Sequence, residues 1–149
     1  MEYFDGAEQG GYCGAGMIIK INHTSYYSLK LSIGLGSNTE VELLALWGLL
    51  YFAKEKDIWL DMVLGDSKAI VEWAKGSYKL HTIQLSHWIN RTKILIEHFQ
   101  HTTFSHIYRE LNTEVDGLSK LAIGVSMNSI EWARFDRLTL MEQGFMNIS

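Results

Sequence analysis

Four acidic residues spread along the sequence carry side chains that divalent metal ions bind readily. They are Asp5, Glu42, Asp66 and Asp116. Oxygen ligands alone suit Mg²⁺ or Mn²⁺, and four carboxylates at one place would repel one another strongly without cations between them. The sequence therefore predicts a magnesium or manganese centre, provided that the fold brings the four residues together.

Each of these acids also has a structural explanation when it is taken alone. Asp5 precedes a glycine, as in a tight turn, and Glu42 lies three residues after Thr39, as in a helix-capping box. Asp66 suits a helix cap, and Asp116 suits the first turn of a helix, where a negative charge complements the helix dipole. The metal-centre interpretation therefore depends on the elements that position the four acids.

Composition limits the class of protein. The chain has 149 residues, 47% of them apolar and 20% charged, which is typical of one globular domain. Cys13 is the only cysteine and the six histidines are scattered, so we expect neither an intrachain disulfide nor a zinc site. The formal net charge of −4 does not by itself favour nucleic-acid binding, although bound metal ions reverse the local sign.

The sequence shows no targeting or membrane signal. Its first residues lack the basic segment and apolar run of a secretory signal. No stretch approaches the roughly 20 apolar residues that span a bilayer. We therefore expect an intracellular protein without a membrane segment, and the compartment stays open among nucleus, cytoplasm and organelle.

The first third of the chain predicts three antiparallel strands. A very short strand at residues 2–4 ends at Asp5, a second strand covers 17–21, and clean alternation of apolar and polar residues marks a third at 27–33. Ser37 and Glu40 then have the spacing of a helix start, and the helix that follows is apolar almost all round. Such a helix is expected between other layers.

The rest of the chain alternates between strands and helices. We expect a strand at 58–64, a helix from Asp66 to about Lys75 stopped by Gly76, a helix at about 82–99, a strand at 103–108, and a helix from its cap Asn112 to about 123. This order predicts an α/β fold with a mixed five-stranded sheet, three antiparallel strands and then parallel ones, and helices on both faces. Asp5 and Asp66 would then leave neighbouring parallel strands at one sheet edge, where such folds place their sites.

Four short segments, in order along the chain, resemble the acidic motifs of ribonuclease H. They are FDGA at 4–7, NTEVEL at 38–43, GDSK at 65–68 and RELNTEVD at 109–116. The resemblance is to the reverse-transcriptase-like branch that is abundant in plant genomes and retroelements. We accordingly expect a ribonuclease H-like domain at 1–124. Residues 125–149 would form an extension packed on it, for instance as a short terminal helix, or mark where a longer polyprotein continues.

The resemblance implies a metal-dependent endonuclease that hydrolyses the RNA strand of RNA–DNA hybrids. Asp5 would bridge two Mg²⁺ ions, with Mn²⁺ as a substitute, and Glu42, Asp66 and Asp116 would complete their ligand shells. The products would carry a 5′-phosphate and a 3′-hydroxyl. Two alternatives stay open: a catalytically weak or inactive nucleic-acid-binding module derived from a retroelement, and an inert fold used for protein contacts.

Contacts beyond the metal are expected at Gly6, Ser37 and Asn38, which match positions near the substrate in the family. Ser37 and Asn38 also suit helix caps, and the glycine-rich stretch at 10–16 either brings backbone amides to the hybrid or forms a mobile connection. His106 is expected to be a core or surface histidine.

The basic extension that some relatives use to bind substrate is absent from this sequence. A diffuse set of basic residues would replace it, namely Lys75, Lys79, His81, Arg91 and Lys93. Trp59, Trp88 and Trp132 are the anchors that a protein-contact role would use. The chain would act as a monomer or as part of a larger polyprotein.

Overall fold

The computed structural model describes residues 1–80 and 83–148. The strands are β1 (Glu2–Gln9), β2 (Tyr12–Lys20), β3 (Ser25–Leu35), β4 (Met62–Gly65), β5 (Thr103–His106), β6 (Ser129–Asp136) and β7 (Thr139–Asn147). The helices are α1 (Asn38–Glu55), α2 (Lys68–Ala74), α3 (Ser86–His98) and α4 (Thr113–Leu121), with short 3₁₀ turns at Ile83–Leu85, Arg109–Leu111 and Ala122–Gly124.

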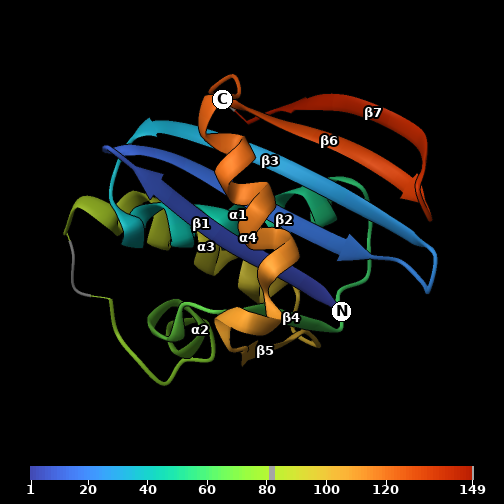
Figure 1. Ribbon diagram of the computed structural model, residues 1–149. Helices are drawn as coiled ribbons and strands as arrows, with labels where there is room; N and C mark the ends of the chain where they lie inside the picture. Colours follow the sequence, from blue (N-terminus) through green and yellow to red (C-terminus); the bar gives the residue numbers. More distant parts are fainter. Residues whose placement is uncertain (81–82, 149) are drawn as a thin grey trace.

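These described strands form one mixed sheet of seven strands, in the order β5-β4-β1-β2-β3-β6-β7 (Figure 1). β1 and β4 are parallel, as are β4 and β5, and the other neighbours are antiparallel. The predicted α/β class and the pairing of the first five strands are confirmed. The predicted number of strands is wrong, because β6 and β7 extend the same sheet.

The extension of the sheet replaces the short terminal helix expected after residue 125. β6 pairs antiparallel with β3, and Ile130 is buried in the core. Trp132 lies on the same side of β6, two residues on, and packs against the rings of Tyr27 and Phe52. The apolar residues of this segment thus have the period of a strand, and pairing with the open edge of β3 satisfies their backbone groups.

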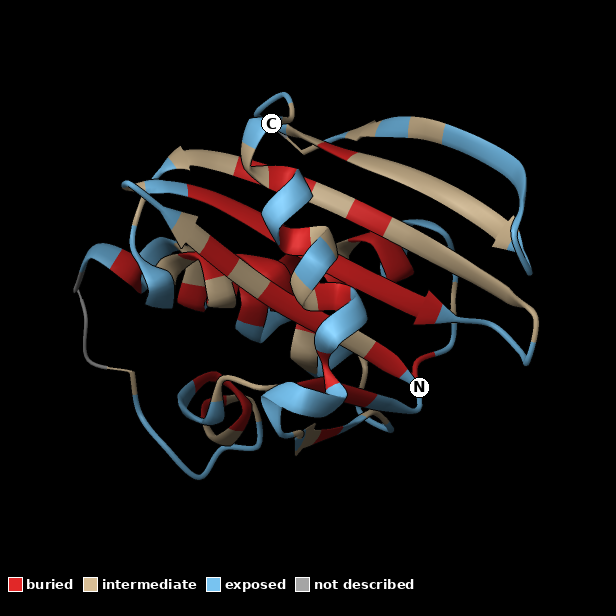
Figure 2. Ribbon diagram, in the orientation of Figure 1, coloured by how far each residue is buried: buried red, intermediate tan, exposed pale blue. Residues whose placement is uncertain are grey.

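Helices cover both faces of the sheet. α1 and α3 lie behind it in Figure 1, and α4 crosses its front. α1 carries buried residues all round, as expected for a helix between the sheet and α3, and Figure 2 shows β2 buried along most of its length. Among the described residues, no helix combines the length and apolar character needed to cross a bilayer.

The glycine-rich stretch lets α4 approach the sheet closely. Gly10 and Gly11 form the turn between β1 and β2, with φ angles of 60° and 88°. A Cβ atom on Gly14 would lie 2.5 Å from the Ser119 carbonyl oxygen, and one on Gly16 would lie 2.6 Å from the Ser119 nitrogen. Residues 13–19 are buried. The predicted mobile connection is therefore wrong for its β2 part, and the predicted contact with substrate stays a prediction.

Asp5 lies in the middle of a long strand and not at the end of a short one. β1 pairs with β2 along its whole length, and Asp5 is opposite Gly16. Other predicted boundaries differ by a few residues. β4 begins at Met62, and α3 begins at Ser86 after a 3₁₀ turn. The start predicted at Thr82 lies outside the described residues, as does His81 of the predicted basic set.

Candidate metal centre

The structure brings three of the four predicted acids into one cluster. Asp5, Glu42 and Asp66 each contribute one carboxylate oxygen, and these oxygens all lie within 4.8 Å of one another. Asp5 comes from β1, Glu42 from the first turns of α1, and Asp66 directly follows β4. Residues far apart in the sequence thus meet where β4 ends beside the middle of β1.

Parallel pairing of β1 and β4 places Asp5 beside Asp66. The last register pair is Phe4 with Gly65, so the two aspartates are the next residues on neighbouring strands. The Phe4 ring occupies the space where a side chain on Gly65 would lie. The positions of Asp5 and Asp66 therefore depend on the contact between Phe4 and Gly65, the residues that directly precede them.

A second glycine positions Glu42. The Gly6 N–H donates a hydrogen bond to Glu42 Oε1 over 3.1 Å. A Cβ atom on Gly6 would lie 2.7 Å from Val41 Cγ1 and 2.9 Å from the Glu42 nitrogen, so only glycine lets α1 come this close to β1. Gly6, predicted to contact substrate, here holds a carboxylate.

Asp116 borders the cluster from α4. Its carboxyl group is within hydrogen-bonding reach of Asp5, but it is not part of the three-residue group. Lys120 Nζ lies 3.0 Å from Asp116 Oδ2, and Ser119 Oγ donates to the Asp116 carbonyl oxygen. The predicted set of four therefore consists of three clustered acids and one at the rim.

Burial and mutual repulsion make the carboxyl groups of Asp5 and Glu42, the two inner acids of the cluster, hard to ionise. Asp5 is only 3% exposed. Burial, together with the charge of Asp66, raises the pKa of Asp5 to about 7. Burial first and the charge of Asp5 second raise the pKa of Glu42 well above its usual value. At Asp116 burial acts in the same direction, but hydrogen bonds with Lys120 and Asp5 and the charges of Lys120 and Arg109 outweigh it and lower the pKa.

The cluster has the properties of a site for hard cations. Asp5 Oδ2, Glu42 Oε2 and Asp66 Oδ2 are buried, and none has a hydrogen-bond partner among the described residues. Buried oxygens without donors are costly, and a divalent cation would satisfy several of them at once. The donor set, which is oxygen only, fits Mg²⁺ or Mn²⁺ and not zinc.

Ser37 directly precedes α1, and Asn38 is the first residue of that helix. Ser37 Oγ accepts a hydrogen bond from the Glu40 N–H over 3.1 Å, so its predicted role as a helix cap is confirmed. Both residues are exposed. Their contact with substrate stays a prediction.

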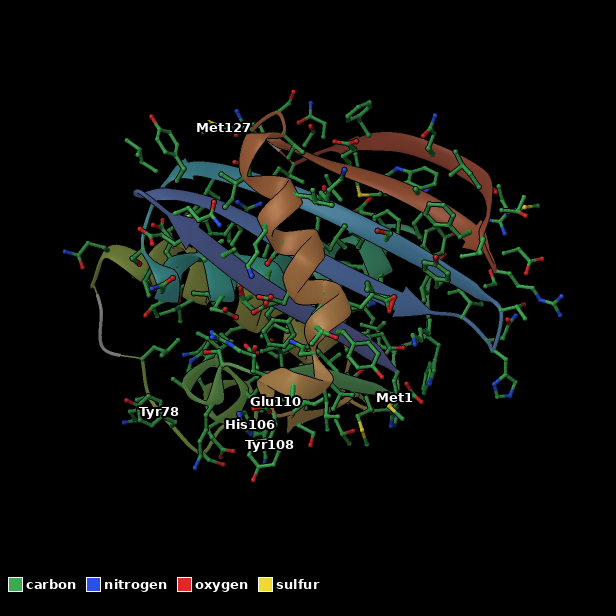
Figure 3. The ribbon with its side chains drawn as sticks, in the orientation of Figure 1. Met1, Tyr78, His106, Tyr108, Glu110 and Met127 are labelled. Atoms are coloured by element: carbon green, nitrogen blue, oxygen red, sulfur yellow. The ribbon has the colours of Figure 1, made fainter. Side chains whose placement is uncertain are left out.

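Two residues beside the cluster were not among the predicted site residues. Arg109 Nε lies 3.9 Å from Asp66 Oδ2, and the Arg109 side chain is 82% exposed. His106 Nε2 lies 3.2 Å from the Asp66 carbonyl oxygen, and its ring contacts that of Tyr108 beside β5 (Figure 3). His106 is thus a surface histidine, as expected. The strand register could have indicated that His106 lies near Asp66, because His106 pairs with Gly65 on the neighbouring strand.

The other predicted surface groups are partly used for packing. The Arg91 guanidinium lies over the rings of Trp47 and Trp88, at 4.5 and 4.9 Å. Trp132 is covered by Lys56, whose Nζ lies 4.3 Å from the ring. Of the three tryptophans considered as protein-contact anchors, only Trp59 is largely exposed, at 71%.

Comparisons with known proteins agree with this geometry. The family model described as reverse transcriptase-like matches residues 3–122. RNase H1 from the halophilic archaeon Halobacterium salinarum shares 23% identity at a TM-score of 0.73, over 81% of this chain and 94% of that one. LC11-RNase H1, isolated from compost and solved in complex with an RNA/DNA hybrid, shares 24% at 0.70, over 82% and 94%.

A third solved structure is the N-terminal RNase H domain of a Mycobacterium tuberculosis protein, determined as a fusion with maltose-binding protein. It shares 26% identity at a TM-score of 0.74, over 82% of this chain and 92% of that one. The search of curated proteins gave no significant match. The sequence match over residues 3–122 and the shared fold establish that the chain belongs to the reverse transcriptase-like family of the ribonuclease H-like superfamily.

Proposed function

We propose that this chain is a metal-dependent endonuclease that hydrolyses the RNA strand of RNA–DNA hybrids. The observation that carries the proposal is the cluster of Asp5, Glu42 and Asp66, whose buried oxygens converge without donors. Such a cluster is costly to the fold unless it binds cations. The hybrid bound to the similar LC11-RNase H1 supports the choice of substrate.

Asp5, Glu42 and Asp66 would hold the metal, with Asp116 at the rim. We propose two Mg²⁺ ions, with Mn²⁺ as a substitute, because the donor set is oxygen only. When bound, such ions would activate water for attack on the scissile phosphate and stabilise the charge of the leaving 3′ oxygen.

The surrounding residues would hold the carboxylates and the substrate. The Gly6 N–H fixes one oxygen of Glu42, which leaves its other oxygen available to a ligand. Ser37 and Asn38 lie at the N-terminus of α1, where exposed backbone N–H groups favour a phosphate. Arg109 lies beside Asp66 and is exposed enough to meet an incoming phosphate as well.

An assay with labelled nucleic acid tests the proposal. Purified protein is incubated with an RNA–DNA hybrid and Mg²⁺, and duplex DNA and duplex RNA serve as substrate controls. We expect cleavage of the RNA strand alone, leaving a 5′-phosphate and a 3′-hydroxyl. Asp66→Asn should abolish this cleavage, and Asp61→Asn, which changes an exposed acid four residues before β4 ends, should leave it intact.

Two other outcomes would contradict the proposal. Hybrid binding without cleavage in either Mg²⁺ or Mn²⁺ would indicate the non-catalytic binding module. Absence of binding as well would point to a fold used for protein contacts, for which Trp59 is the exposed candidate anchor. Whether the chain acts as a monomer or within a larger polyprotein stays a prediction.

A further inference from the structure

Asn112 connects two of the carboxylate-bearing segments. It lies directly before α4 and is only 2% exposed. Its Nδ2 donates a hydrogen bond to the Phe4 carbonyl oxygen over 3.3 Å. Its own carbonyl oxygen accepts a hydrogen bond from the Asp116 N–H over 3.0 Å. One buried residue thus contacts the peptide group that precedes Asp5 and the backbone of Asp116.

Because α4 packs closely on β2, the hydrogen bonds of Asn112 can influence how far Asp116 lies from Asp5. Gly16 is the register partner of Asp5, and a Cβ atom there would lie 2.6 Å from the Ser119 nitrogen and 2.9 Å from the Val115 carbonyl oxygen. α4 therefore lies directly over the strand pair that carries Asp5. A small shift of its first turn would change the separation of the Asp5 and Asp116 carboxylates.

Helix capping does not explain Asn112. An asparagine before a helix usually accepts a hydrogen bond from an N–H of the first turn, but the Asn112 side chain makes no such bond. Its Oδ1 is buried and has no partner among the described residues. A buried acceptor without a donor destabilises the fold. The side chain therefore gives up its capping bond and leaves one oxygen unsatisfied in order to reach β1.

We propose that Asn112 is a positioning residue that fixes the separation of Asp5 and Asp116 and thereby sets the affinity of the site for divalent cations. The inference rests on the metal site of the proposed function but not on hybrid cleavage. Residues that orient metal ligands through hydrogen bonds commonly change metal affinity when they are altered.

The test uses Asn112→Leu, which keeps a similar side-chain shape and removes the donor and the unpartnered oxygen together. Metal affinity is measured by calorimetric titration of the folded protein with MgCl₂ or MnCl₂ alone, and stability by urea denaturation without metal. We expect affinity to fall by roughly 10-fold to 100-fold. Stability should change little, because the loss of a long hydrogen bond is offset by removal of a buried orphan acceptor.

Thr92→Val is the matched control. Thr92 is fully buried in α3, its Oγ1 donates to the Trp88 carbonyl oxygen, and it lies on the opposite side of the sheet from α4. Its loss should reduce stability and leave metal affinity unchanged. If Asn112→Leu is unstable, Asn112→Ser provides a smaller polar replacement for the same titration.

The outcomes separate this inference from the proposed function. Metal affinity within two-fold of the wild type in both folded Asn112 variants would overturn the positioning role and leave Asn112 as a structural residue. Wild-type protein that binds metal but never cleaves a hybrid would overturn the proposed function and leave this inference in place. Wild-type protein that binds neither cation would overturn both.

Discussion

The three clustered acids and Asp116 at the rim fall into two pairs that differ in their electrostatic surroundings. Asp5 and Glu42, the inner pair, lie on β1 and at the start of α1, and the described residues place no cation beside either carboxylate. Asp66 and Asp116, the outer pair, each have a cation nearby. Arg109 lies 3.9 Å from Asp66, and Lys120 lies 3.0 Å from Asp116. Side-chain exposure rises outward to 10% for Asp66 and 28% for Asp116.

The difference shows where the protein needs a metal. The outer acids are partly neutralised by the protein itself, and their cations lie at the surface, where solvent weakens such pairs. The inner acids have no such partner, and burial raises the pKa of both. Most of the binding free energy of a cation should therefore come from relief of repulsion in the inner pair.

Asp5→Asn should give the largest effect. Loss of this ligand should lower the rate of hybrid cleavage by roughly 10³-fold or more, since metal ions supply several kcal/mol of transition-state stabilisation and about 1.4 kcal/mol is tenfold in rate. The same variant should stabilise the metal-free fold at pH 8 by roughly 2–4 kcal/mol, because it removes a buried charge whose pKa is raised to about 7. Cleavage kinetics and urea denaturation measure the two effects.

An activity loss accompanied by a stability loss would contradict this interpretation of the inner pair. Asp57→Asn is a suitable control, because Asp57 is an exposed acid after α1 and outside the cluster. Asparagine also tolerates the positive φ of 54° at that position. It should change neither the rate nor the stability appreciably.

The stability of the metal-free protein should depend on pH in the direction set by the inner pair. The pKa of Asp5 rises from 3.8 to about 7 on folding, so its contribution is complete below about pH 4 and is lost as the pH rises through 7. Glu42 acts in the same direction. Saturating Mg²⁺ should therefore raise the melting temperature much more at pH 8 than at pH 5.

The titration of Glu2 must be distinguished from that of Asp5 and Glu42 when the pH dependence of stability is measured. Burial raises the pKa of its carboxyl group to about 7 as well, so Glu2 titrates in the same pH window. Glu2→Gln should flatten part of the pH dependence but leave the Mg²⁺-induced shift intact. Glu42→Gln should reduce both. Equal Mg²⁺ shifts at pH 5 and pH 8 in the wild type would show that the inner acids do not bind the cation as charged groups.

Local pattern was sufficient to predict the framework around these acids. The apolar periodicity indicated the order of strands and helices, and Ser37 was identified as the cap of α1. The predicted parallel pairing of the first and fourth strands placed Asp5 beside Asp66, although β1 continues to Gln9 and does not end at Asp5. These inferences succeed because they depend on residues close together in the sequence or on chain topology.

The missed features depend on contacts between distant segments. Gly6 and Gly16 look like flexible residues in the sequence, but each makes room for a helix whose position is known only in the folded chain. Asn112 looked like an ordinary cap, and its bond to Phe4 spans more than a hundred residues. The β6–β7 hairpin was missed although Ile130 and Trp132 alternate as in a strand, because the open edge of β3 that accepts them could not be foreseen.

Lys120→Gln should give the smallest effect and show how weakly Asp116, in the outer pair, is coupled to the metal. Without the ammonium group, the pKa of Asp116 should rise, and repulsion between Lys120 and a bound cation should disappear. We expect metal affinity to increase by roughly two-fold to three-fold, because exposed ion pairs are worth about 0.2–1 kcal/mol. The gain should shrink in 0.5 M NaCl, at which screening shortens to roughly 4 Å.

Lys75→Gln provides the matched control for this variant, because Lys75 forms a similar surface pair with Glu72 on α2. It should leave the calorimetric titration with Mg²⁺ unchanged at either salt concentration. A ten-fold change in metal affinity for Lys120→Gln would show that Asp116 is as strongly coupled to the metal as the inner acids. The distinction between an inner and an outer pair would then not hold for Asp116. A change of two-fold to three-fold keeps Asp116 at the rim, where its separation from Asp5 depends on Asn112 more than on Lys120.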